Sequence, residues 1–200
     1  MQSQRLAMID AALTQIAAQL NVHLRHRFQV NEDLAVLSNL LEQNGTLVPL
    51  IANKLVLFLV GVEQDAYAHR AIGMGLNAQA QLRGSEPVFL NLLMMCAANF
   101  SGSNYPEALK FLSGAIHFFH ERPVLDHQNT PGLDQRLDKL VLNIENLSSA
   151  EMHSLWGIHS GRYLPSVLYR IRMVSIAGQQ IQGREQAVGQ LDPRLIRGLS

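Results

Sequence analysis

The sequence predicts a single α+β domain in which helices cover a mixed, largely antiparallel sheet of about four to five strands. Two stretches are apolar almost without interruption, as is typical of strands buried on both faces. Other stretches repeat apolar residues at helical spacing. The length of 200 residues suits one domain with a substantial core. We expect the domain over residues 1–177, with a C-terminal extension over residues 178–200.

The longest of these stretches, residues 88–100, predicts a strand in the middle of the sheet. Helical spacing also fits residues 90–98, and periodicity alone does not decide between the two. Asn91 and Asn99 favour the strand, because a buried amide is most easily paired near the ends of a strand.

A helix is predicted after the turn at residues 101–104. Asn104 and Glu107 have the spacing of a capping box, and Pro106 falls in the first turn, where its missing N–H costs nothing. Gly114 predicts a close approach to a neighbouring backbone. Two adjoining stripes form the expected buried face: Leu109, Leu112, Ile116 and Phe119 in one, and Ala108, Phe111, Ala115 and Phe118 in the other.

The N-terminal part predicts a helix and two strands. Residues 5–24 form an amphipathic helix that ends in the basic run 23–27. Residues 34–40 favour a strand, although the leucines there also fit a helix. Residues 54–63 predict a strand that is apolar on both faces and ends in acidic residues.

The remaining segments alternate between loops and regular elements. Residues 66–86 lack a sustained pattern and predict a mobile loop or arm, and residues 122–133 predict an irregular connection. Residues 135–146 alternate like a strand with one wet face. Ser148 and Glu151 form a capping box that opens a short helix ended by Gly157 or Gly161. Pro165 opens the last strand.

Composition excludes several classes of function. The net charge is zero, so attraction of the whole molecule to nucleic acid or to an anionic membrane is not expected. Charged residues make up only 16% of the chain, which favours self-assembly. The single cysteine, Cys96, lies in a predicted buried strand and is expected to be inert. No signal peptide or membrane helix is recognisable, so we expect a cytoplasmic protein without membrane insertion.

Candidate chemical groups are few. His117 and His120 share a helix face and Asp126 follows, a set that a metal-dependent hydrolase could use. Zinc needs three or four convergent ligands, and histidines at a helix C-terminus also suit the helix dipole. We therefore expect no catalytic residue, no metal and no cofactor.

Two arginines and three aromatic residues are candidate contact residues. Arg170 and Arg172 share one face of the last strand and could grip phosphate, as in a nucleic-acid-binding module. We favour a solvated or inter-subunit face, because no basic surface surrounds them. Tyr105, Trp156 and Tyr163 are expected to be exposed interface anchors.

Three stretches together resemble a known family. They are NKLVLFLVGVEQD (53–65), PVFLNLLMMCAANFSGSNYPEALKFLSGAIHFF (87–119) and NTPGLDQRLDKLVLNIENLSSAEMHSLWGIHSGRYLPSVLYRIRM (129–173). They are similar to the tail terminators, or caps, of contractile injection systems, which are phage-tail-like particles such as antifeeding prophages and related virulence cassettes. Residues 66–86 match no fixed pattern of that family.

The resemblance implies a structural protein rather than an enzyme. It implies a homo-hexameric ring that sits on the last ring of the inner tube protein and holds the last layer of the sheath protein. Such a ring would lie at the distal, cap end of the particle. The family carries no catalytic motif to transfer, and some of its members continue beyond the equivalent of Gly178.

Overall fold

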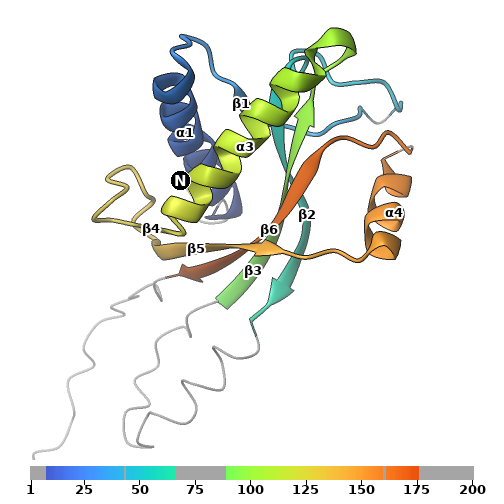
Figure 1. The fold of residues 1–200 in the computed structure, drawn as a ribbon. Coiled ribbons are helices and arrows are strands. Elements are labelled where there is room, and N and C mark those ends of the chain that lie inside the picture. Colours follow the sequence, from blue (N-terminus) through green and yellow to red (C-terminus); the bar gives the residue numbers. More distant parts are fainter. Residues whose placement is uncertain (1–7, 43, 66–88, 160, 176–200) are drawn as a thin grey trace, which may run out of the picture.

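The computed structural model describes residues 8–42, 44–65, 89–159 and 161–175 (Figure 1). The elements follow in chain order: α1 (Met8–Phe28), β1 (Ala35–Leu37), β2 (Lys54–Gln64), β3 (Phe89–Asn99), a 3-10 turn (Gly102–Asn104), α3 (Tyr105–Glu121), β4 (Val124–Asp126), β5 (Leu137–Glu145), α4 (Ser149–Ile158) and β6 (Ser166–Ser175). The predicted α+β class is confirmed.

The strands form one six-stranded sheet in the order β1-β2-β3-β6-β5-β4. β1 runs parallel to β2, and all other neighbours are antiparallel. β3 lies in the interior of the sheet, as its apolar run predicted. The additional strand is β4, which falls in the segment predicted to be irregular. β1 has three residues, fewer than predicted, because the chain pairs with β2 only over Ala35–Leu37.

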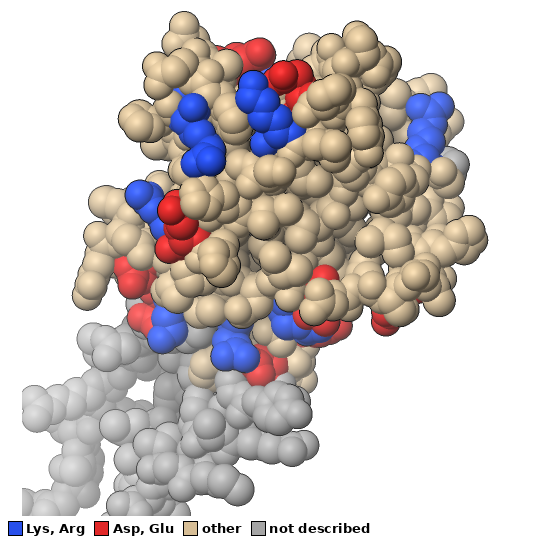
Figure 2. All heavy atoms as spheres, viewed as in Figure 1, with Lys and Arg blue, Asp and Glu red and all other residues tan. Residues whose placement is uncertain are grey.

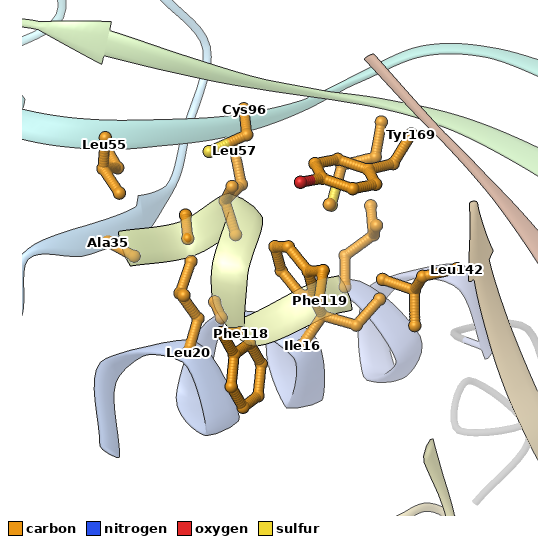
Figure 3. Close-up of a cluster of buried hydrophobic side chains, with 14 of the residues drawn as sticks. Ile16, Leu20, Ala35, Leu55, Leu57, Cys96, Phe118, Phe119, Leu142 and Tyr169 are labelled. Carbon is orange, nitrogen blue, oxygen red and sulfur yellow. The ribbon is translucent and has the colours of Figure 1, made fainter. Parts of the chain in front are cut away.

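The main core lies between one face of the sheet and the two long helices. Figure 1 shows α1 and α3 together on this face, and Figure 3 shows Ile16, Leu20 and Phe119 pointing toward the strands. Phe119 of α3 packs on Tyr169 of β6 with ring centroids 4.8 Å apart, whereas Phe118 packs on His23 of α1 and joins the two helices. Each large side chain buried in this way contributes about 1.5–3 kcal/mol, so packing dominates the placement of both helices.

α3 agrees with its predicted face but differs from the prediction at three positions. Leu109 is exposed, whereas the second stripe is buried. Asn104 precedes the helix without a side-chain cap hydrogen bond, because its backbone (φ −86°, ψ 7°) is not in the extended conformation typical of a capping residue. A Cβ on Gly114 would lie 2.8 Å from Cε2 of Phe28, so the close neighbour is a side chain of α1 rather than a backbone.

The opposite face of the sheet carries a second, smaller core. α4 and residues 40–51 cover this part of the sheet, where Val56, Phe58, Met95 and Leu168 are buried. The predicted capping box of α4 is confirmed: Ser148 Oγ accepts from the backbone N–H of Glu151, and the Glu151 carboxylate accepts from the backbone N–H of Ser148. The helix ends before Gly161, whose φ of 67° is easily adopted only by glycine.

The prediction that β2 is apolar and buried on both faces is correct only for its first half. Leu55–Phe58 are buried, but the residues from Leu59 onward are exposed or half-buried. The reason is that α4 and β1 both lie beside the first half of the strand. None of the helices in the described part of the chain is long and apolar enough to cross a membrane.

Candidate interaction surface

The sheet face that carries the second core becomes polar beyond α4. In the register of the strands, Glu63 of β2, Asn91 of β3 and Arg172 of β6 lie in one row across the sheet. Arg170 and Asn143 follow in a neighbouring row. Side chains directly opposite on adjacent strands share a face, so these polar groups form one continuous area.

Arg170 connects three strands across this polar area. Its guanidinium group forms ion pairs with Glu63 of β2 and with Glu145 of β5, the latter at 2.8 Å. Hydrogen bonds to both carboxylates raise the pKa of Arg170, and the bond to Glu145 has the larger effect. The bond from Arg170 lowers the pKa of the Glu145 carboxyl below its usual value. The guanidinium is therefore neutralised by two carboxylates.

Arg172 is also paired with an acidic residue. Its Nε lies 3.0 Å from a carboxylate oxygen of Asp65, a side chain that is almost fully buried. The sequence places the acidic end of β2 more than 100 residues before these arginines, and only the register through β3 brings them together. One indication of these ion pairs is present in the sequence: the acidic residues Glu63 and Asp65 and the basic residues Arg170 and Arg172 have the same spacing of two positions.

The charges on the molecular surface follow the same mixed pattern. On the face shown in Figure 2, basic side chains lie next to acidic ones, and broad uncharged areas separate these mixed groups from one another. No large area of one sign is visible on that face. The alternative of a nucleic-acid-binding module depended on Arg170 and Arg172, and both lie on carboxylates.

The predicted aromatic anchors occupy different environments. Tyr163 is 62% exposed and Tyr105 is also exposed, but Trp156 is only 3% exposed. The prediction of an exposed Trp156 is therefore wrong, because its indole packs into the second core beside Phe58. Tyr163 stands edge-on to Trp156 at 5.7 Å between ring centroids. Tyr105 lies on α3, which covers the opposite face of the sheet.

A groove of about 400 Å³ lies beside Tyr163. Its walls are mainly apolar, with Leu41, Phe100 and Leu164 among them, and Arg162 supplies a cation. His159 also lines the groove, and burial against Phe58 and Trp156 lowers the pKa of its imidazole. The mainly apolar walls suit a packed contact with another surface.

The histidines considered as metal ligands do not converge. His117 lies 3.3 Å from Glu121 one turn along the same helix. The carboxylate of Asp126 accepts from the backbone N–H groups of Gln128 and Asn129, as in an ordinary turn. Within the described ranges, no group of three or more His, Cys, Asp and Glu side chains is arranged to hold a metal ion.

Cys96 lies in the interior of the main core. Burial raises the pKa of its thiol to about 12. The thiol is therefore protonated at neutral pH, and the nucleophilic thiolate is not populated.

The fold is similar to that of a solved terminator protein from a contractile injection system. The chain is similar to a solved structure described as the PVC sheath/tube terminator of an extracellular contractile injection system in the extended state, with a TM-score of 0.51 and 13% identity. The match covers 92% of this chain and 64% of the other, so this chain spans about two thirds of that protein's length. A second similar structure is the cap of the anti-feeding prophage, with a TM-score of 0.49 and 11% identity, over 87% of this chain and 60% of that one.

The sequence itself identifies the family. Residues 11–190 match the family model of the Pvc16 N-terminal domain, and the chain belongs to this family. The resemblance inferred from the three sequence stretches is thereby confirmed. The comparison with curated proteins found no match.

Proposed function

We propose that the chain is a structural cap of a contractile injection system. In this proposal six copies form a ring that ends the inner tube and anchors the last sheath layer, at the distal end of a particle assembled in the cytoplasm. The observation that carries the proposal is membership of the Pvc16 N-terminal domain family over residues 11–190. The fold shared with a sheath/tube terminator supports it.

The chemistry of the described residues is compatible with a role in assembly rather than catalysis. The strand arginines are neutralised, the one thiol is buried, and the groove beside Tyr163 has mainly apolar walls. Such a surface recognises partners by shape and apolar contact. We propose that the chain is not an enzyme and that it binds neither a cofactor nor nucleic acid.

The contacts are assigned to specific parts of the chain. Tyr105, Tyr163 and the Arg170–Arg172 area are proposed to meet neighbouring subunits, tube or sheath, and Trp156 supports Tyr163 from below. The predicted arm at residues 66–86 and the extension at residues 178–200 lie outside the described residues. We propose that both reach neighbouring subunits.

The test is to purify the full-length chain, measure its native mass and image it by electron microscopy. A hexameric ring that binds the ends of purified tubes is the expected result. Deletion of residues 178–200 should weaken ring formation or capping.

The alternative hypothesis, a metal-dependent hydrolase, is tested on the same preparation. Elemental analysis should find no stoichiometric metal, and His120→Ala should leave assembly unchanged. A metal-loaded monomer that loses its metal in His120→Ala would overturn the proposal.

A further inference from the structure

One edge of the sheet is open along the second half of β2. β1 covers only the beginning of this strand, where Leu55 N–H donates to Leu34 O and Ser38 N–H donates to Leu57 O. Backbone groups alternate in direction along a strand, so those of Leu59 also point to this edge. β1 has ended there, and no other described strand pairs with this edge.

The open edge continues past a β-bulge. The bulge lies between Leu59 and Gly61, opposite Met94 and Leu93 of β3. Beyond the bulge, Asp65 N–H donates to Phe89 O, so the backbone groups of Asp65 point toward β3. Because this direction alternates from residue to residue, the backbone groups of Val62 point to the open edge. Leu59 and Val62 are opposite Met94 and Leu92, so both side chains lie on the main-core face.

This edge has the properties of a strand-binding site. Val62 is 44% exposed, and the residues from Leu59 to Val62 include no charged side chain. A groove of about 370 Å³ lies where β1 leaves β2, with Leu13, Asn39 and Leu59 in its lining. Soluble monomers usually protect such edges with charges, proline or a covering loop.

The opposite edge of the same sheet has a matching opening. β4 pairs with Lys139, Leu140 and Val141 of β5, and Leu142 N–H donates to Pro123 O just before β4. By the same alternation, the backbone groups of Ile144 point to the same edge of β5 as those of Leu142. β4 does not extend along β5 as far as Ile144. Ile144 is 48% exposed and lies opposite Tyr169, which places its side chain on the main-core face.

We propose that the open β2 edge at Leu59–Val62 of one copy pairs with the β5 end at Ile144 of a second copy. β2 runs parallel to β6 and β5 runs antiparallel to it, so this join continues the antiparallel sheet. The apolar side chains of both edges lie on the same face and meet at the join. The occupant is a second copy because one chain carries both complementary edges.

The contact is heterologous, since it joins two different surfaces of the same chain. Heterologous contacts close into rings when the rotation between copies permits. The inference therefore rests on the self-association in the proposed function and specifies its contact.

The test uses pairs of cysteine variants of the full-length chain, in which the buried Cys96 remains unreactive. Val62→Cys and Ile144→Cys are mixed and oxidised, and each is also oxidised alone. We expect disulfide-linked dimers in the mixture only, and a ladder of linked copies from the double variant. Dimers from Val62→Cys alone, or a mixture that stays monomeric, would overturn the proposal.

A proline substitution tests the role of the backbone. Val62→Pro removes an N–H that points to the open edge and spares the hydrogen bonds to β3. We expect at least tenfold weaker self-association, whereas the matched control Val62→Thr, which keeps the N–H, should assemble like the wild type. Val62→Lys places a charge at the same edge and should also weaken association, and circular dichroism verifies the fold of each variant.

The results separate this contact from the proposed function. A ring that caps tubes equally well with Val62→Pro would refute the edge contact and leave the cap function standing. A chain that remains monomeric and binds no tube end would refute both.

Discussion

Gly114 of α3 lies directly against side chains of α1. A methyl group there would meet the ring of Phe28 at 2.8 Å and Cδ2 of Leu24 at 3.2 Å. The Phe28 ring is itself packed edge-on against Phe111 at 5.0 Å. Glycine at this position therefore lowers the helix propensity of α3 but leaves room for the side chains of α1.

Gly114→Ala tests this balance. Alanine gains about 1 kcal/mol of helix propensity, but overpacking costs about 1–3 kcal/mol, so we expect a net destabilisation of about 1 kcal/mol. The measurement is urea unfolding of the single variants and of Gly114→Ala with Phe28→Leu. The added alanine should become neutral or stabilising in the Phe28→Leu background, and equal effects in both backgrounds would contradict the steric explanation.

His159 predicts a dependence of stability on pH. Burial lowers the pKa of its imidazole, so the unfolded chain takes up a proton before the folded chain does. Stability should therefore fall as the pH drops below about 6.5, the usual histidine value.

The change in unfolding free energy between pH 7.5 and pH 5.5 measures this effect. It should be smaller in His159→Gln than in the wild type. The exposed His153→Gln serves as the control and should retain the wild-type difference; equal pH dependence in all three proteins would count against the assignment.

At the scale of elements, two predicted helix caps have different outcomes. Ser148 caps α4 in a reciprocal capping box, whereas Asn104 makes no cap hydrogen bond to α3. The spacing of the two predicted caps is the same, but Ser148 has an extended backbone (φ −65°, ψ 161°), whereas Asn104 ends a 3-10 turn with φ −86° and ψ 7°. The backbone conformation of the preceding turn, and not the residue type alone, therefore decides whether the cap forms.

Removing the two caps should have different costs. Ser148→Ala is expected to lower stability by about 1 kcal/mol, since it leaves an N-terminal N–H of α4 unpaired. Asn104→Ala and the neighbouring Ser149→Ala should have little effect. Denaturant midpoints for the three variants give the comparison, and equal losses in Ser148→Ala and Asn104→Ala would contradict the difference between the two caps.

At the scale of the whole molecule, Arg170 links parts of the chain that are distant in sequence. Its partners Glu63 and Glu145 come from strands on either side of the β3–β6 pair. Exposed ion pairs contribute little singly, but a guanidinium that binds two carboxylates forms a small network.

Arg170→Met should cost about 1 kcal/mol, because two carboxylates lose their cation while the aliphatic part of the side chain is kept. The loss should shrink in 1 M NaCl, where ion pairs are screened. Arg162→Met, which removes an arginine without a carboxylate partner among the described residues, is the control. An effect that does not change with salt would show that packing, not charge, explains the loss.

The sequence by itself determined the α+β class, the central strand β3, the buried stripe of α3 and the family, because each depends on patterns within one continuous segment. It also revealed the cap of α4. The tertiary structure decided which strands are neighbours, and with that the pairing of Arg170 and Arg172 with acidic residues and the burial of Trp156. It also decided that half of β2 is open, because coverage of a strand depends on elements distant in sequence, and neither composition nor periodicity records their positions.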